Sequence, residues 1–436
     1  MKKDRELIYL RKLAGKYSGI LTDRIYYFPG NNIGSRLNIC TAILPNYEKK
    51  VSSLYSNASY HLSGYGDTFK DSLIRMEGEA VERYAGIVSH KYLVDRIFKS
   101  SYKEINGLKP DIQLLNPYTN AQINQISKII YNFRDRPLRE EDVISWVNAK
   151  SIFYPEKDVV VPASSFFIGF DNNELRNNIG VSTGTATFSN VSHALENSVI
   201  EYLQIDAFMS AWYSQEKIPT IILKDYSKHI QELVKNKLGV LDRFYCCYLI
   251  DLTPFSKVKL NVYGVFLVAK NNDIVPAISF GLQGGFNKEN TIIRSFYEAL
   301  ANLKMEEDKY IFCNGKYKDV DINKIVNMDD NVDYFANNNH FEQNIDYLGK
   351  RLKLVKSFNK EKELVNNLKT LMEKLKDVAP MSCFLDITPP YLAIDFRVIR
   401  VYIPELMVVT FPSFPQMNLP SFLGGKNEKY YIHPMP

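Results

Sequence analysis

The chain has 436 residues, of which 45% are hydrophobic and 24% charged, which excludes a disordered or fibrous protein. Its net charge is only +5 and its basic residues are interspersed with acidic ones, so we expect no nucleic-acid partner. No apolar run approaches the ~18 residues of a membrane helix, and the N-terminus lacks a signal-peptide core. The five cysteines show no zinc-site or redox-motif spacing. A cytoplasmic protein with no membrane partner is therefore expected.

The predicted helices and strands follow one another without the regular alternation of a doubly wound sheet. Residues 1–60 combine short apolar runs with turn signals and are interpreted as an N-terminal lead-in to a domain spanning 61–436. The patterns predict helices over 69–88, 190–212, 290–303 and 343–377, and strands over 159–170, 244–252, 260–270, 391–402 and 406–411. We therefore predict an α+β fold in which mixed sheets pack against helices.

The last predicted helix, 343–377, is rich in lysine and arginine. A solvated face of an amphipathic helix accounts for these charges. A docking surface for an acidic peptide or a partner subunit is the alternative.

Three of the predicted helices share one layout. Each follows a stretch rich in Gly, Ser or Thr and carries polar groups about one helical turn apart. The pairs are Glu79 with Glu82, Glu201 with Gln204, and Arg294 with Glu298. Such spacings place both members of a pair on one helix face. Taken alone, each pair is explained by a solvated face or an intrahelical ion pair.

Convergence of the three helices would change this interpretation. Carboxylates that face one site repel one another, and some take up protons unless a cation binds between them. Oxygen-rich sites of this kind suit Mg²⁺, which is commonly shared with substrate phosphates. The Gly, Ser and Thr turns would offer backbone N–H groups to those phosphates. The result would be a nucleotide site without a Walker loop, a motif that the sequence lacks.

Four segments, in the same order along the chain, resemble the signatures of the YcaO family. Where the family has G-K-G-x-T and then S-A-x-x-E-A-x-E-R-Y, this chain has Gly64-x-Gly66-x-Thr68 and then Glu79-Ala80-x-Glu82-Arg83-Tyr84. The second signature, S-T-G-x-A followed by E-x-x-E-R-D-A, is similar to Ser182-Thr183-Gly184-x-Ala186 followed by Glu201-x-x-Gln204-x-Asp206-Ala207. The third, R-A-x-x-E-A, is similar to Arg294-x-x-x-Glu298-Ala299, and the P-x-P-x-P tail of azoline-forming members resembles Pro434-Met435-Pro436.

The resemblance implies a YcaO-type ATP-binding fold and an ATP- and Mg²⁺-dependent enzyme that acts on peptide amide bonds. A Cys, Ser or Thr side chain of a ribosomal precursor peptide would attack the preceding carbonyl, ATP would phosphorylate the oxygen, and loss of phosphate would leave a thiazoline or oxazoline. The resemblance also implies roles for individual residues. The metal ligands would be Glu79, Glu82, Glu201 and Gln204; the nucleotide-binding residues Ser182, Thr183, Ser189, Arg83, Arg294 and Glu298; and the catalytic tail residues His433, Pro434 and Pro436.

Several positions depart from the family pattern. Tyr65 stands where the family has Lys, and Arg75 where it has Ser. Gln204 and Ile205 replace a Glu-Arg pair, which removes one carboxylate and one phosphate-binding cation, although a Gln carbonyl oxygen can still ligate a metal. Ile432 replaces the first Pro of the tail. These changes leave a non-catalytic scaffold subunit as an alternative.

The resemblance also implies partners. Some azoline-forming members are fused to an E1-like leader-binding region, and the first signature here begins at Gly64, so we expect a separate E1-like partner protein to bring the precursor peptide. This arrangement is similar to the split cyclodehydratases of streptolysin S-type bacteriocin and toxin pathways, which often include a flavin-dependent dehydrogenase. An enzyme that makes thioamides or amidines is a further alternative, against which the Pro-rich tail argues.

Overall fold

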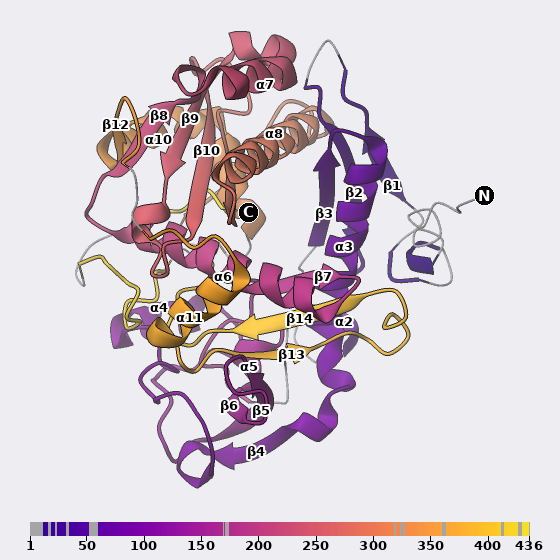
Figure 1. The fold of residues 1–436 in the computed structure, drawn as a ribbon, viewed down its shortest axis with the longest axis vertical. Coiled ribbons are helices and arrows are strands. Elements are labelled where there is room, and N and C mark those ends of the chain that lie inside the picture. The colour runs from indigo at the N-terminus through magenta and orange to yellow at the C-terminus, as the bar shows by residue number, and fades with distance from the viewer. Residues whose placement is uncertain are drawn as a thin grey trace.

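The computed structural model describes the chain apart from residues 1–11, 16–18, 22–23, 32–34, 52–59, 169, 171–173, 318–319, 323–324, 326–327, 360–362, 411–413, 426–429 and 436. Within the described part, three β-sheets pack against helices (Figure 1). This is the α+β architecture that the sequence predicts.

The first sheet has three antiparallel strands in the order β1-β2-β3. The strands are β1 Ile25–Phe28, β2 Asn38–Leu44 and β3 Tyr60–Gly66. Helix α3, Phe69–Val88, packs on β2 and β3 and has the bounds that the sequence predicts. Thr68 caps this helix, because its hydroxyl accepts a hydrogen bond from Asp71 N at 3.1 Å. The tight turn between β3 and α3 therefore fixes the helix directly beside the strand.

The second sheet has five strands in the order β11-β10-β9-β8-β12. They are β8 Ile218–Ile222, β9 Tyr245–Asp251, β10 Asn261–Ala269, β11 Ile278–Gly285 and β12 Leu352–Leu354. Only the β8–β12 pair of this sheet is parallel. Helix α8, Lys288–Phe312, covers β10 and β11.

The third sheet is antiparallel, in the order β4-β5-β13-β14-β7, with β6 also paired to β5. Its strands are β4 Ile97–Ser101, β5 Val143–Ser151, β6 Asp158–Pro162, β7 Thr185–Phe188, β13 Cys383–Asp386 and β14 Arg397–Tyr402. Helix α6, Val191–Tyr213, packs on β7 and β14 and also contacts β11 of the second sheet. In Figure 1 this helix crosses the centre of the molecule between the two sheets.

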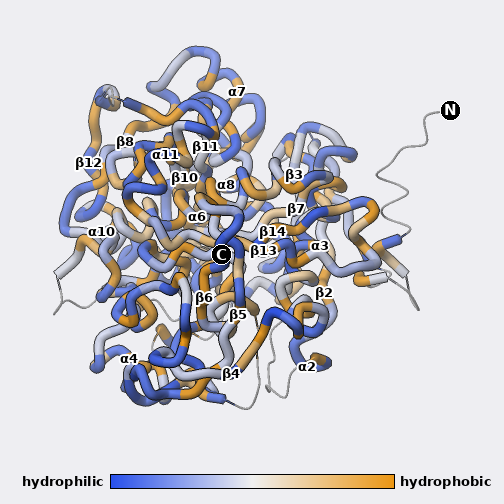
Figure 2. Tube along the Cα trace, turned by 60° about the horizontal axis from the view of Figure 1, so that its bottom comes forward, coloured by the Kyte–Doolittle hydropathy of each residue, from blue (hydrophilic) through white to orange (hydrophobic). Residues whose placement is uncertain are grey.

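Shorter helices surround these sheets. They are α2 Glu48–Val51, α4 Asn120–Ile129, α5 Ala163–Phe166, α7 Lys228–Leu238, α9 Met328–Ala336, α10 Phe341–Arg351 and α11 Leu368–Val378. Along α7, at the rim of the molecule, hydrophilic and hydrophobic residues alternate (Figure 2), and Ile230, Val234 and Leu238 are its buried positions. Among the described residues, no helix is long and apolar enough to cross a membrane.

The core is divided between two large groups of buried side chains. One lies around α6, α8 and the second sheet and includes Trp212 and Phe266. The other lies between α3 and the strands of the first and third sheets and includes Val81 and Val398. Helix α3 contacts β7, and α8 contacts β3. The three helices that carry the predicted site residues are therefore held together at the junction of the sheets.

Two of the predicted strands are too long. The predicted strand 159–170 becomes helix α5 at Ala163, and the predicted strand 391–402 forms a strand only from Arg397.

Two further predicted elements are wrong, and in both cases long-range contacts explain why. The charged segment 343–377 is not one helix, because residues 352–354 pair with the edge of β8 as β12 and Asn367 caps the separate helix α11. Residues 406–410 form no strand, because their N–H groups bond to side chains: Met407 N to Asp206 Oδ1 at 2.8 Å and Val408 N to Gln416 Oε1 at 2.9 Å. Residue 411 lies outside the described residues.

Close packing of β3 on α3 leads to the first prediction. A Cβ at Gly64 would lie 2.0 Å from Ser72 O and 2.3 Å from Met76 N, both backbone atoms. Gly64→Ala should therefore lower the free energy of unfolding in urea by about 1–3 kcal/mol. Gly78→Ala is the matched control, because a Cβ there meets no atom within 4 Å, and it should stabilise the helix by roughly 0.5–1 kcal/mol. Equal effects of the two substitutions would contradict this packing.

Candidate active site

Two glutamates of α3 lie at the centre of the candidate site. Glu79 and Glu82 are both partly buried and are one helical turn apart. The Ser63 N–H of β3 donates to Glu79 Oε2 at 2.7 Å, and the Arg83 guanidinium lies 3.5 Å from Glu79 Oε1. The Glu79 carboxylate is thus held between a strand and a cation, on the helix face that the sequence predicts.

Arg83 links α3 to the loop that precedes β7. Its guanidinium donates to Ser182 Oγ at 2.7 Å, so Ser182 lies beside the α3 carboxylates. Thr183 faces the core instead: it is 1% exposed, and its hydroxyl accepts from Val409 N at 3.4 Å. Ser189 is exposed between β7 and α6. Of the three predicted hydroxyl groups, the structure brings that of Ser182 to Arg83.

Glu82 of α3 and Glu201 of α6 lie within electrostatic reach of each other. Burial raises the pKa of Glu82 well above its ordinary value, and the charge of Glu201 raises it further while Arg83 lowers it. Burial also raises the pKa of Glu201 to about 8, although Arg83 and Arg400 act to lower it. A pair of carboxylates that both resist ionisation is a place where an added cation is stabilising.

The end of β11 holds the next two predicted residues. Leu282 N donates to Glu298 Oε2 at 2.9 Å, and Gln283 Nε2 donates to the same oxygen at 3.0 Å. Gly284 N donates to Gln204 Oε1 at 2.6 Å. The Gln204 oxygen therefore already accepts a backbone hydrogen bond and has one further lone pair for a metal.

The side chains of the three helices converge, as the layout of their polar pairs suggested. Burial raises the pKa of Glu298 to about 7, its hydrogen bonds and Arg294 lower it, and the charge of Glu79 on α3 raises it. Glu79 of α3 and Glu298 of α8 thus share one electrostatic environment. Arg294 is exposed one helical turn before Glu298.

No preassembled metal cage is present among the described residues, since no three His, Cys, Asp or Glu side chains come close enough to bind one ion together. This agrees with the coordination preference of Mg²⁺. One or two carboxylates usually bind the ion, and water and substrate phosphates complete its octahedral coordination. The protein side of the site therefore supplies pairs of oxygen donors rather than a closed set.

The C-terminal tail passes through the core. His433 is fully buried; its Nε2 donates to Thr410 O at 2.6 Å, and Asn331 Nδ2 of α9 lies 3.2 Å from its Nδ1. Burial lowers the pKa of His433 to about 4, so the ring is neutral at pH 7. Pro434 lines a small cavity beside β11 and α9. These contacts anchor the tail, and a catalytic role of His433 and Pro434 stays a prediction; Pro436 lies outside the described residues.

Sequence reasoning missed two charged residues that shape the site. Arg400 of β14 is 2% exposed; it donates to Phe166 O at 3.1 Å and to Thr185 Oγ1 at 3.0 Å, and it also bonds Thr183 O. It thus ties the loop before β7 to α5. Burial raises the pKa of Asp329, in the first turn of α9, while Lys309, His61 and, to a smaller extent, Arg83 lower it. A lone arginine within an apolar strand was the signal for Arg400, whereas nothing local marked Asp329.

The sequence profile of one family, described as YcaO cyclodehydratase, ATP- and Mg²⁺-binding, matches residues 63–407. The chain belongs to the YcaO family. The match covers all three helices of the site, and it confirms the family, the enzyme class and the cofactors ATP and Mg²⁺ that the sequence predicts. Among curated proteins, no sequence matches the chain.

Solved YcaO structures share the fold. A heterocyclase in complex with substrate and cofactor is 16% identical with a TM-score of 0.68; the match covers 93% of this chain and 52% of the heterocyclase, so the chain spans about half of that protein's length. The E. coli microcin synthetase McbBCD complex contains a chain that is 15% identical, with a TM-score of 0.66 and coverage of 94% and 96%. The YcaO protein of Methanopyrus kandleri, bound with AMPPCP and Mg²⁺, is 15% identical, with a TM-score of 0.56 and coverage of 92% and 89%.

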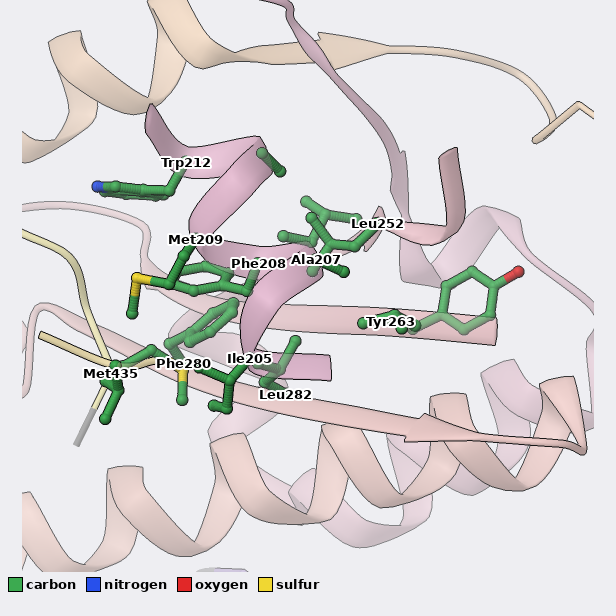
Figure 3. Close-up of a cluster of buried hydrophobic side chains, with 14 of the residues drawn as sticks. Ile205, Ala207, Phe208, Met209, Trp212, Leu252, Tyr263, Phe280, Leu282 and Met435 are labelled. Atoms are coloured by element: carbon green, nitrogen blue, oxygen red, sulfur yellow. The ribbon is translucent and has the colours of Figure 1, made fainter. Parts of the chain in front are cut away.

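The residues of this YcaO chain fit a bound Mg²⁺. Glu82 and Glu201 present carboxylates whose pKa values are raised chiefly by burial, and for Glu82 also by the charge of Glu201, so a cation bound beside them would favour their charged forms. The family's arginine in E-R-D-A is replaced by Ile205, whose side chain lies near Phe280, Leu282 and Met435 in the hydrophobic cluster of Figure 3. At this position the chain therefore contributes to the core and offers no charge to a phosphate.

The raised pKa of Glu201 predicts a pH-dependent loss of stability in the absence of metal. Because its pKa is about 8 in the folded protein and about 4.3 in an unfolded chain, the folded state binds the extra proton between these values, and stability falls as the pH rises through them. In EDTA, the difference in Tm between Glu201→Gln and the wild type should therefore increase in favour of the variant from pH 5 to pH 8.5.

Mg²⁺ should reduce that difference by neutralising the carboxylate in the wild type. The exposed Glu373→Gln on α11 is the control for a generic change of charge. A difference in Tm that is independent of pH would contradict the electrostatic description of this carboxylate pair.

Proposed function

We propose that the protein is an ATP- and Mg²⁺-dependent cyclodehydratase that converts Cys, Ser or Thr residues of a ribosomal precursor peptide to thiazolines or oxazolines. The observation that carries this proposal is the convergence of Glu79 and Glu82 of α3, Glu201 of α6 and Glu298 of α8 within a member of the YcaO cyclodehydratase family. Two structurally similar proteins, a heterocyclase in complex with substrate and a microcin synthetase complex, support the same class of reaction.

In the proposed reaction, a thiol or hydroxyl of the peptide attacks the preceding backbone carbonyl, and its proton is lost. The carbonyl oxygen takes the terminal phosphoryl group of ATP, and ADP leaves. The amide nitrogen then loses its proton, the C–O bond breaks with departure of phosphate, and the C=N bond of the ring forms. The net change in the peptide is the loss of one water for each ring.

The chain's own residues position and neutralise charge in this scheme. Mg²⁺, when bound, would neutralise the phosphate oxygens and polarise the transferred group. Glu79, Glu82 and Glu201 would hold the metal, with Gln204 supplying a neutral oxygen. Arg83, fixed by its contacts with Glu79 and Ser182, would face the phosphates. Such positioning and charge neutralisation supply most of the catalysis in phosphoryl transfer.

We further propose that a separate E1-like, leader-binding protein delivers the peptide, as in streptolysin S-type pathways, and that a flavin-dependent dehydrogenase acts on the azolines. The microcin synthetase to which this chain is structurally similar is a complex, which supports assembly with other proteins. Arg294 and Ser182 would contact the nucleotide, and the tail that ends in Pro434 to Pro436 would take part in the peptide site.

The test combines the protein with its peptide, the partner protein, ATP and Mg²⁺, and follows the peptide by mass spectrometry while released phosphate is assayed. Glu79→Gln should lower ring formation by on the order of 10²–10³-fold, because one charge of the metal site is lost while the Ser63 N–H can still bond to an amide oxygen. Glu373→Gln on α11 should leave ring formation unchanged, and both variants should still bind the partner protein.

An intact complex that leaves the peptide unchanged and releases no phosphate would contradict the enzymatic proposal. It would favour the scaffold alternative, to which the replacements at Gln204 and Ile205 point. A product in which sulfur replaces the amide oxygen, or in which an amidine forms, would instead assign the site to the other YcaO chemistries.

A further inference from the structure

Arg75 lies on the site face of α3, one helical turn before Glu79. It is exposed, its Nη1 donates to Tyr65 O at 2.6 Å, and its guanidinium carbon lies 5.4 Å from the centre of the Tyr65 ring. Both contacts hold the planar cation over Tyr65 at a distance typical of a cation–π interaction. The backbone of β3 and the aromatic ring thus give this long side chain a defined position.

Tyr65 also lies within electrostatic reach of charged residues on α8. Its pKa is raised, chiefly by burial and then by the charge of Glu298, while Arg294 and Arg75 lower it, and Glu79 raises it. The charges of Arg75 on α3 and of Arg294 and Glu298 on α8 thus all act on Tyr65. Within the described part of the chain, neither guanidinium forms an ion pair with a carboxylate.

The acidic neighbour of this pair is already neutralised. Asp67, in the turn between β3 and α3, forms an ion pair with Lys237 of α7 and accepts a hydrogen bond from Tyr297 Oη at 3.0 Å. Although burial raises the pKa of Asp67, the bonds from Lys237 and Tyr297 lower it below its ordinary value. Asp67 thus keeps its charge but shares it with Lys237, which leaves the Arg75 and Arg294 guanidinium groups available to an external anion.

We propose that Arg75 binds a phosphate group of the nucleotide together with Arg294 across the space between α3 and α8. The inference rests on the proposed use of ATP and names a binding residue for it. Guanidinium groups match phosphate geometry and donate in pairs. The family pattern has a lysine where this chain has Tyr65 and an arginine where it has Ile205, and Arg75 restores one of these two positive charges. In this chain that charge lies on α3.

The test measures binding of Mg²⁺·AMPPCP and of adenosine to the purified protein by titration calorimetry, without peptide or partner. Loss of a charge-assisted hydrogen-bond donor predicts that Arg75→Ala weakens AMPPCP binding by roughly 10–100-fold and changes adenosine binding less than about twofold. Arg75→Lys should recover part of the affinity, since it restores the charge but not the paired donors. Arg243→Ala, an exposed arginine beyond α7, is the matched control and should bind both ligands as the wild type does.

Equal weakening of adenosine and AMPPCP, or unchanged AMPPCP binding by Arg75→Ala, would overturn the inference. Thermal unfolding of each variant shows whether it is folded. The outcomes also separate the inference from the proposed function. If AMPPCP binding depends on Arg75 but no peptide is cyclised, the inference stands and the proposed reaction fails. If peptides are cyclised but Arg75→Ala leaves AMPPCP binding unchanged, the proposed reaction stands and the inference fails.

Discussion

The cost of ionising two neighbouring, partly buried carboxylates is the constraint on which the site depends. Burial raises the pKa of Glu82 on α3 and of Glu201 on α6, and the charge of Glu201 raises that of Glu82 further. The fold can hold them there because α3 is fixed to β3 by close backbone contact and α6 is fixed between two sheets. The packed core therefore keeps the two carboxylates in positions where their ionisation is unfavourable, and a bound cation lowers that cost. Stability and ligand binding are coupled at this point in the molecule.

The scaffold around this constraint uses backbone groups as much as side chains. Ser63 N, Leu282 N and Gly284 N donate to Glu79, Glu298 and Gln204, one from β3 and two from β11. Edge strands, which would otherwise present unpaired N–H groups, thus orient the polar side chains of the helices. Arg400 supports the Ser182–Thr185 loop in the same way, with two hydrogen bonds to the loop and a third to Phe166 O of α5. Preorganised donors of this kind position charged groups with little reorganisation when a ligand binds.

Local signals predicted the helices of the site well, and long-range contacts account for what the sequence could not show. The Gly-x-Gly-x-Thr turn and the apolar period of α3 are local features, and the helix has the expected bounds. The failure at 343–377 comes from pairing of β12 with a strand more than a hundred residues earlier. The failure at 406–410 comes from Asp206, Gln416 and Thr183, which bond to N–H groups that an apolar run would otherwise pair in a sheet.

The same distinction applies to the site. Spacing along each helix predicted which residues share a face, but only the fold shows that Thr183 faces the core and that Gln204 already accepts a backbone hydrogen bond. The sequence showed only that Arg75 departs from the family pattern. The structure shows that its guanidinium is held by the Tyr65 backbone and ring, which is the basis for the phosphate-binding role proposed for it.

The most direct test of the central claim is a crystal structure of the protein with AMPPCP and Mn²⁺ in place of Mg²⁺, from which anomalous scattering locates the metal. The account predicts a metal bound by the carboxylates of Glu82 and Glu201, with the phosphates of AMPPCP completing its coordination. A metal and nucleotide bound elsewhere, with these two carboxylates still facing each other without a cation, would contradict it.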